Sequence, residues 1–550
     1  MNEQSPNLDC STAAGESAAF PIMVAPARTS TSLKEPFTAD RTDGLFALFA
    51  FVLGFYFARW VLFSWEGWGV TVFTLVYCAS LTIYLVKKGV QIPKASWFWL
   101  ALTALTGISF SLWTNIGLEP WRSLLLLGSA VYWVVCATGL LILGQTSNWI
   151  GLDGINGFLI IPFSNFVSQY KSLSFLSRNK KTQTSQFLSI ALGLIITVIV
   201  MAIVFPLLLK ADGGGFARLT GGILTYFKEI KLGEYVIHAI LAVPIAAYIF
   251  GLAAGSAHKR GCDVFKKEST RQAFSVLRIL PAATIYTLLG LLCSLYVLFI
   301  ASQLPYFFSA FAGQRPEGWQ VYSEYARSGF FELCRIAAIN LSVLLIANLF
   351  GKNVSTVKDS EASPDTAGSE TNRLHGGKIL KILNALLAVL TLLLIATAMS
   401  KMFLYIGVYG LSMRRLLPCL FMVFLAVICG GVIALQKWHF SMARLGAVVG
   451  SVMLCALCLF DPDGFVTHYN TERYLAGSLT DFDVEILRRS GPAGVDSALK
   501  VYAQTGDQTL QSELKEYLLT QKQQAGKFSG QHRDNLQKSR ARQNIAQYSL

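Results

Sequence analysis

Long apolar stretches recur along the chain from Leu45 to Phe460, and polar segments of varied length separate them. A helix needs about 20 residues to cross the hydrocarbon layer of a bilayer, and each stretch is close to that length. The pattern therefore predicts an all-α, polytopic transmembrane bundle of about eleven spans. We place these spans at residues 45–63, 70–86, 97–112, 123–143, 187–209, 235–255, 279–301, 329–350, 379–399, 416–435 and 445–460.

Three connecting segments differ from simple loops. Residues 147–170 are apolar but contain three glycines and Pro162, a composition that favours a surface-lying or re-entrant segment over a twelfth span. Residues 212–234 place apolar side chains near helical spacing with basic residues between, which favours an interfacial amphipathic helix over a plain loop. Residues 353–377 have too few apolar side chains to fold, so we expect a disordered loop.

Spans and polar segments together divide the chain into five parts. After Asp461 the apolar residues recur at steps of three and four, which predicts a small helical tail that frays beyond Gly526. The expected parts are a disordered cytoplasmic leader (1–44), a first membrane part of about eight spans (45–350), a disordered cytoplasmic loop (351–378), a second membrane part of about three spans (379–460) and a soluble helical tail (461–550).

Composition supports the membrane class, since 53% of the residues are hydrophobic and only 14% are charged, against about 25% charged in soluble domains. The net charge of +14 lies mostly in short loops between spans, so it indicates membrane topology and not a nucleic-acid partner. Basic residues are more frequent in the loops on the side of the amino terminus. This distribution predicts a cytoplasmic amino terminus and, with an odd number of spans, a carboxyl tail outside the cell membrane.

Signals for common chemistries are missing from the sequence. Eight of the ten cysteines fall in apolar spans, and the C-x-x-C of Cys455 and Cys458 has no polar neighbours, so we expect packing residues in place of a disulfide, metal or redox site. The chain has no phosphate-binding loop and no H-E-x-x-H motif. We expect no cofactor, no metal and no catalytic residue, although a membrane-bound transferase stays open.

The candidate polar site lies in the eighth span. Glu332 and Arg335 share a helical face at i and i+3, so they could pair where water is scarce, and Asn340 and Asn348 continue the polar character of that span. Two interpretations stay open: a substrate or proton site, and a structural ion pair that fixes helix packing.

Two further polar residues lie near the outer ends of other spans. Arg59, beside Trp60, is expected to extend to the lipid headgroups, and His238 opens the sixth span at the same level. We interpret both as interfacial residues.

Four segments, at residues 207–219, 304–333, 404–416 and 468–487, together resemble the bacterial membrane-protein family of domain of unknown function 4173 (DUF4173), which is related to DUF4153. The resemblance supplies architecture and candidate residues but no mechanism. With the predicted topology, all four segments lie on the outer side, which suggests one outer functional surface. The most specific segment carries Pro316, Glu317, Gly318, Tyr322, Glu324, Tyr325, Ala326, Arg327, Gly329, Phe330, Phe331, Glu332 and Leu333 in the family's spacing.

These observations leave two main hypotheses for a multi-pass protein of the cytoplasmic membrane. The first is transport of a solute or lipid, because polar residues in one span of a large bundle could line a path. The second is a non-catalytic envelope sensor or assembly factor, which uses the outer loops and the tail to bind a partner. Besides the lipid bilayer, the expected partner is thus a small molecule, a lipid or an envelope protein.

Overall fold

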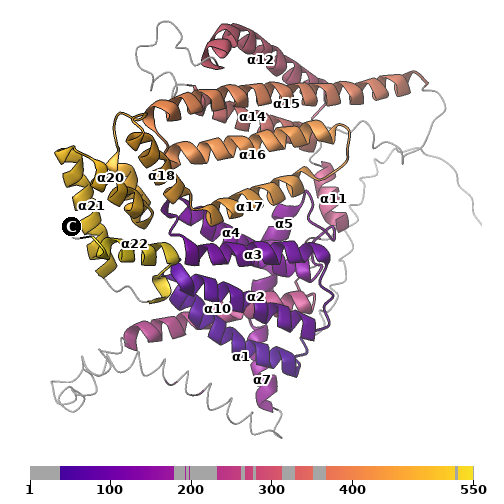
Figure 1. Ribbon diagram of the computed structural model, residues 1–550. Helices are drawn as coiled ribbons and strands as arrows, with labels where there is room; N and C mark the ends of the chain where they lie inside the picture. The colour runs from indigo at the N-terminus through magenta and orange to yellow at the C-terminus, as the bar shows by residue number, and fades with distance from the viewer. Residues whose placement is uncertain are drawn as a thin grey trace, which may run out of the picture. The chain divides into compact units, whose positions relative to one another are not determined.

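A computed structural model describes residues 37–178, 193, 197, 232–261, 265, 267–276, 280–311, 329–350, 367–526 and 531–548 (Figure 1). These residues form helices and no β-strand, as the sequence predicts. Ten helices are long and apolar enough to cross a membrane, and an eleventh candidate is a bent pair. The ten are α1 with η1 (Arg41–Tyr56, Phe57–Leu62), α2 (Gly67–Lys87), α3 (Lys94–Leu112), η2 with α4 (Ile116–Leu118, Glu119–Ala137), α10 (Leu232–Ala257), α12 (Ala282–Phe311), α14 (Phe330–Phe350), α15 (Ala367–Tyr409), α16 (Met413–Leu435) and α17 (Met442–Phe460).

The predicted spans agree with these helices except at some ends. The fifth predicted span, 187–209, lies outside the described residues apart from Gly193 and Thr197, as do residues 212–231 of the amphipathic helix predicted at 212–234. α4 ends at Ala137, six residues before the predicted end, because Gly139 adopts a left-handed φ of 69° and the chain turns there. α15 already begins at Ala367, inside the stretch predicted as a loop.

Contacts between span termini define the two ends of the bundle. Asp43, at the start of α1, contacts Lys88 after α2 and His258 after α10. We call this end the amino end. At the opposite end, Glu66 before α2 pairs with Lys538 of the carboxyl-terminal segment, so we call it the tail end. The start of α1 and the tail therefore lie at opposite ends of the bundle.

The apolar segment after α4 forms α5 (Ile150–Ile155), η3 (Asn156–Ile160), α6 (Ile161–Ser164) and α7 (Ser168–Arg178), with a bend of 46°. Both termini of this segment lie at the amino end of the bundle. Asn148, just before it, accepts a hydrogen bond from Ser441 at the start of α17, whereas Gly44 at the start of α1 lies against Leu176 of α7. A segment that enters and leaves at the amino end fits the predicted re-entrant interpretation.

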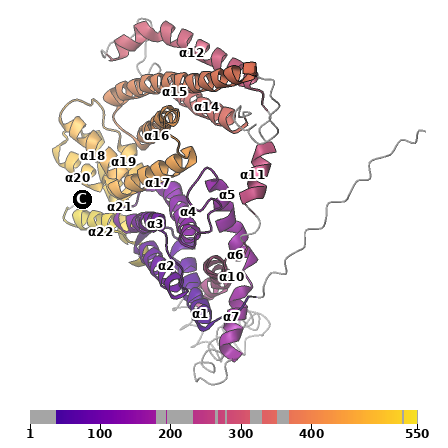
Figure 2. The same ribbon diagram turned by 90° about the vertical axis from the view of Figure 1, so that its right-hand side faces the viewer.

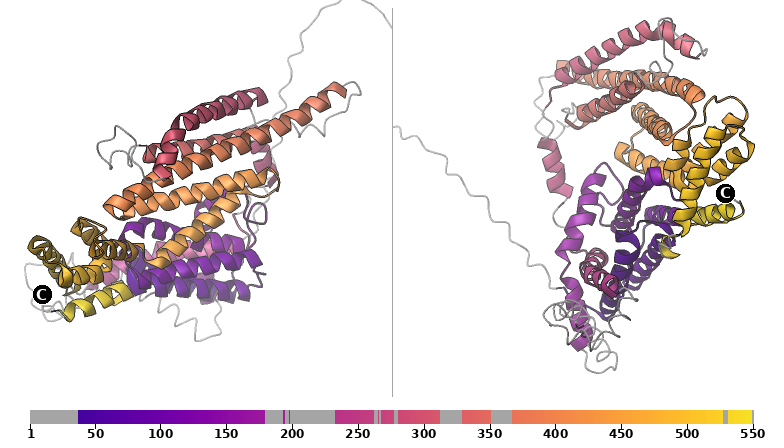
Figure 3. Two further views of the ribbon diagram at one scale, coloured as in Figure 1. Left: turned by 45° about the horizontal axis from the view of Figure 1, so that its top comes forward. Right: turned by 90° about the vertical axis from the view of Figure 1, so that its left-hand side faces the viewer.

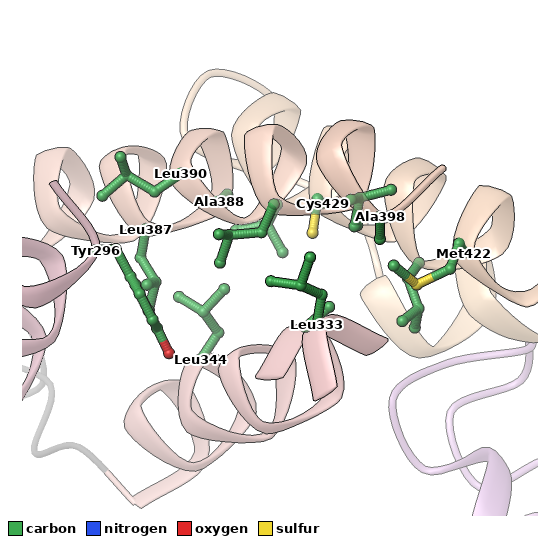
Figure 4. Close-up of a cluster of buried hydrophobic side chains, with 14 of the residues drawn as sticks. Tyr296, Leu333, Leu344, Leu387, Ala388, Leu390, Ala398, Met422 and Cys429 are labelled. Atoms are coloured by element: carbon green, nitrogen blue, oxygen red, sulfur yellow. The ribbon is translucent and has the colours of Figure 1, made fainter. Parts of the chain in front are cut away.

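Two groups of helices form the membrane part. α1 to α4 pack with α10, and α12, α14, α15 and α16 enclose a second apolar core (Figures 2 and 4). Figure 4 shows Leu333, Leu344 and Leu387 pointing toward one another in that core. α17 contacts α3 and α4 on one side and α16 on the other. It approaches α16 closely at Gly431, where a Cβ would lie 2.4 Å from Leu445.

The tail forms α18 (Pro462–Leu475), α19 (Val484–Ser490), η4 (Gly491–Gly494), α20 (Val495–Gln504), α21 (Gln508–Gly526), η5 (Gln531–Arg533) and α22 (Leu536–Ala546). Its helices gather at one end of the long helices (Figure 3). The predicted fraying beyond Gly526 is wrong for residues 531–548, because Ala541 and Ile545 of α22 are buried in the tail core. α22 has too few apolar residues for a helical pattern of apolar positions to be visible in its sequence.

Candidate functional site

The predicted pair Glu332 and Arg335 lies at the start of α14, at the tail end, and both side chains are exposed. Glu332 accepts a hydrogen bond from the amide of Gly329 at 2.8 Å, so it satisfies a free amide at the start of its own helix. No nitrogen–oxygen contact within ion-pair distance joins these two described side chains, but the Arg335 charge acts on Glu332, so their pairing stays a prediction.

A third charge in this region was missed by the sequence reasoning. Lys401 of α15 places its ammonium group 3.2 Å from the Cβ position of Gly329, beside the start of α14. The sequence signal was weak, since Lys401 lies two residues beyond the predicted span 379–399. Tyr322, Glu324, Tyr325 and Arg327, the other predicted members of this site, lie outside the described residues.

Asn340 is buried and bridges three helices. Its amide oxygen accepts a hydrogen bond from the Tyr296 hydroxyl of α12 at 2.7 Å, and its amide nitrogen donates to the Thr391 hydroxyl of α15 at 3.0 Å. Asn348, two turns further along, accepts a longer bond of 3.5 Å from Asn384 of α15. These bonds fasten α14 to its neighbours, as polar residues commonly do between membrane helices. They support the structural interpretation of this polar span.

A buried charged network at the amino end was also missed. The Asp43 carboxylate is 0% exposed and lies 2.7 Å from the Lys88 ammonium, 2.7 Å from the Tyr84 hydroxyl and 3.1 Å from His258 Nε2. Its backbone amide donates to Asp40, which completes a capping box at the start of α1. Asp43 therefore joins α1, α2 and α10 through one side chain. The capping pattern was visible in the sequence, but the partners come from distant helices.

At the tail end, the membrane helices and the tail meet in a polar seam around Arg122 of α4. The Arg122 side chain is 1% exposed and lies 3.8 Å over the Phe110 ring. It donates hydrogen bonds of 3.0 Å to the carbonyls of Trp113 and Thr114, which holds the turn between α3 and α4. In that turn Asn115 adopts a left-handed φ of 48° and donates to the Cys458 carbonyl of α17 at 2.8 Å.

Residues 531–548, which we call the strap, close this seam. Gln537 accepts a hydrogen bond from the Thr114 amide at 2.9 Å and donates to Asp461 at 2.7 Å. The Trp68 amide donates to the Asp534 carbonyl at 2.9 Å. Lys538 lies 2.6 Å from Glu66, so the strap is fixed to the starts of α2 and α4 and to the end of α17.

The tail also binds the second group of helices. Asn470 of α18 both accepts from the Leu411 amide and donates to the Leu411 carbonyl, each at 2.7 Å, in the turn between α15 and α16. Arg473 donates to the Ile406 and Gly407 carbonyls at 3.2 and 2.9 Å. Two of the four family-like segments, 404–416 and 468–487, are therefore in direct contact at the tail end.

Two carboxyl groups of the seam titrate abnormally. Burial, and then the neighbouring charge of Asp461, raise the pKa of Asp463 to about 6, while the backbone amides of Gly117 and Ile116 oppose the rise. Burial also raises the pKa of Asp461, which follows the last span directly. The stability of the junction between the tail and the membrane part should therefore increase as the pH falls through the range in which Asp463 gains a proton.

The described residues contain no group of three metal-ligating side chains. Cys455 and Cys458 are buried in α17, and the Thr106 hydroxyl of α3 donates to Cys455 Sγ at 3.6 Å. This environment fits the packing role expected for both cysteines.

The chain matches the model of one protein family. The model of a family described as Domain of unknown function (DUF4153) matches residues 100–359 and 368–501. No curated protein and no solved structure matches the chain. The matched region includes the polar span, the seam around Arg122 and the tail up to α20, whereas α1, α2 and the strap lie beyond it.

Proposed function

Because the chain belongs to the DUF4153 family, we propose its function from the contacts of its tail: it is a non-catalytic membrane protein that holds a helical platform on the outer side of the membrane for an envelope partner. One observation carries this proposal. The tail is fixed to both groups of membrane helices, through Asn470 on one side and the strap on the other. Only Asp461 separates α17 from α18, so the platform follows the last span without a flexible linker.

The polar residues of the eighth predicted span support a transport path less well than the tail contacts support the platform. Glu332 and Arg335 lie exposed at a helix end, and the amide of Asn340 is already bonded to Tyr296 and Thr391. An amide whose oxygen and nitrogen both bond to neighbouring helices contributes to packing and leaves little for a moving solute.

In-cell photocrosslinking tests the platform. A photoreactive amino acid at Ser512 or Lys515, both exposed on α21, should give a discrete cross-linked species in living cells. The same group at Lys259, exposed at the amino end, is the matched control and should not give that species. Asn470→Ala, which loosens the platform, should weaken the cross-link. Equal labelling patterns from the tail positions and the control would contradict the proposal.

Transport of a solute or lipid is the second candidate, favoured by the amino-end network. Asp43 is a buried acid in contact with His258, Lys88 and Tyr84, and ionisable groups of this kind serve proton relays in transporters. If the network relays protons, Asp43→Asn should abolish proton uptake into proteoliposomes, whereas Glu513→Gln, which changes an exposed acid of the tail, should not. Liposomes that take up no protons with the unaltered chain would remove this candidate.

We also propose the finer placement of the chain. The four segments that resemble DUF4173 support membership of that related bacterial group. The distribution of basic residues supports a cytoplasmic amino terminus in the cell membrane and a tail outside it, because positive loops stay on the cytoplasmic side.

A further inference from the structure

Basic and aromatic side chains gather at the tail end of α1 and α10, away from the seam. Arg59 lies in η1, a single π-helical stretch, a conformation often found at functional sites. Its guanidinium lies 4.8 Å from the ring centroid of Tyr235 on α10. His238, one turn further along α10, packs between Phe55 and Phe63 with ring centroids 6.2 and 5.7 Å away. Arg59 and His238, which the sequence predicts to be interfacial, therefore lie near each other.

The strap brings two more basic residues to the same place. A Cβ on Gly69 of α2 would lie 2.9 Å from Trp60, the neighbour of Arg59, and 3.2 Å from the His532 carbonyl. A Cβ on Gly67 would lie 2.4 Å from the backbone of Arg533. Burial, and then the charges of Arg533, Arg59 and His238, lower the pKa of His532, so the local electrostatic potential is positive.

The described acids near this cluster offset only part of its positive charge: Glu234 of α10 acts on His238. In the described part of the chain, neither Arg59 nor Arg533 forms an ion pair, and the buried atoms Nδ1 of His238 and Nε of Arg533 have no hydrogen-bond partner. Glu66, the nearby acid before α2, is already paired with Lys538. Four basic groups held together with few counter-charges raise the free energy of the folded chain, and a bound anion would lower it.

We propose that Arg59, His238, His532 and Arg533 form a binding site for a phosphate-type anion at the tail end of α1 and α10. Guanidinium groups bind phosphate oxygens through paired, charge-assisted hydrogen bonds, and imidazole nitrogens add further donors. Phe63 and Ile237, each 52% exposed, flank the cluster and provide an apolar border. The anion is a lipid phosphate headgroup or a soluble phosphate, and the proposal does not depend on the function proposed for the tail.

Thermal unfolding of the full chain in nanodiscs tests the site, because a ligand bound to the folded state raises Tm. Phosphatidylglycerol added to phosphatidylcholine discs should raise Tm if the ligand is a headgroup, and inorganic phosphate should do so in phosphatidylcholine discs if the ligand is soluble. Arg59→Gln and Arg533→Gln should each weaken the response about tenfold or more, as expected for the loss of charged hydrogen bonds. Added salt should weaken it as well.

Arg489→Gln is the matched control, since it removes an exposed arginine of the tail far along the sequence from the cluster, and it should leave the response unchanged. Arg59→Lys keeps the charge and should restore part of the response, which separates loss of binding from loss of folding. The proposal is overturned if neither anion changes Tm, or if the response is the same in Arg59→Gln, Arg533→Gln and the control.

Discussion

Replacing Gly67 should release the strap from the membrane helices. Gly67 adopts a φ of 71° before α2, and a Cβ there would lie 2.4 Å from both the Arg533 carbonyl carbon and the Asp534 oxygen. Backbone atoms at this distance cannot move aside without moving the strap. Gly67→Ala should therefore break the Trp68 to Asp534 hydrogen bond and disturb the contacts of Gln537 and Lys538.

Gly89, at the other end of α2, provides the matched control. It has the same φ of 71°, but a Cβ there would meet nothing within 4 Å. Both substitutions carry the cost of a left-handed alanine, about 1 to 2 kcal/mol. Gly67→Ala should lose in addition three hydrogen bonds worth about 1 kcal/mol each and a partly exposed ion pair worth up to about 1 kcal/mol, a further loss of about 3 kcal/mol.

Amide hydrogen exchange in detergent measures this difference directly. In Gly67→Ala, the amides of α22 should exchange at least about 100-fold faster than in Gly89→Ala, because about 3 kcal/mol of local stability corresponds to that factor. The amides of α20 should change less than those of α22, because most of the tail core comes from α19, α20 and α21. Equal exchange of α22 in the two variants would refute the view that the strap is docked on α2.

Three other changes test the site. The pKa of Asp463 is raised from its ordinary 3.8 to about 6, so the folded state binds a proton more tightly than the unfolded chain, and stability should rise as pH falls from 7 to 5. In Tm measurements Asp463→Asn should reduce that slope and leave the part that comes from the raised pKa of Asp461, and an unchanged slope would show that Asp463 does not cause it. Asn340→Leu should lower stability by about 1 to 2 kcal/mol, less when combined with Tyr296→Phe than the two single losses together, and strict additivity would exclude their bond. Glu332→Gln and Arg335→Gln should each change stability by no more than about 0.5 kcal/mol, and a strong coupling in the double variant would mean that they pair after all.

The spans could be predicted from the sequence because hydropathy over some 20 residues measures transfer into lipid, a local property. Ten of the predicted spans correspond to helices of the structure. The ends were predicted less well, since they depend on single residues such as Gly139, whose left-handed conformation ends α4. The re-entrant segment was recognisable because glycines and Pro162 disrupt an otherwise apolar run.

The site was predictable only where its signal was local. Asn340 was identified as a polar residue in an apolar span, but its partners Tyr296 and Thr391 lie on other helices, and no spacing reveals them. The pairing of Glu332 with Arg335 stays a prediction, because helical spacing brings two side chains to one face without deciding whether they are buried. Arg122 was missed because its partners are carbonyls of a turn that forms only in the folded chain.

The central claim is that the tail is held as a platform on the outer side of the membrane, opposite the start of α1. Cysteine labelling with a reagent that cannot cross the membrane tests it most directly, in a chain whose native cysteines are replaced and in cells without an outer-membrane barrier. Single cysteines at Ser512 in the tail and at Lys259 at the amino end are both exposed. The claim predicts that only Ser512→Cys is labelled in intact cells and that both are labelled after the cells are opened. Labelling of Lys259→Cys in intact cells, alone or together with Ser512→Cys, would contradict it.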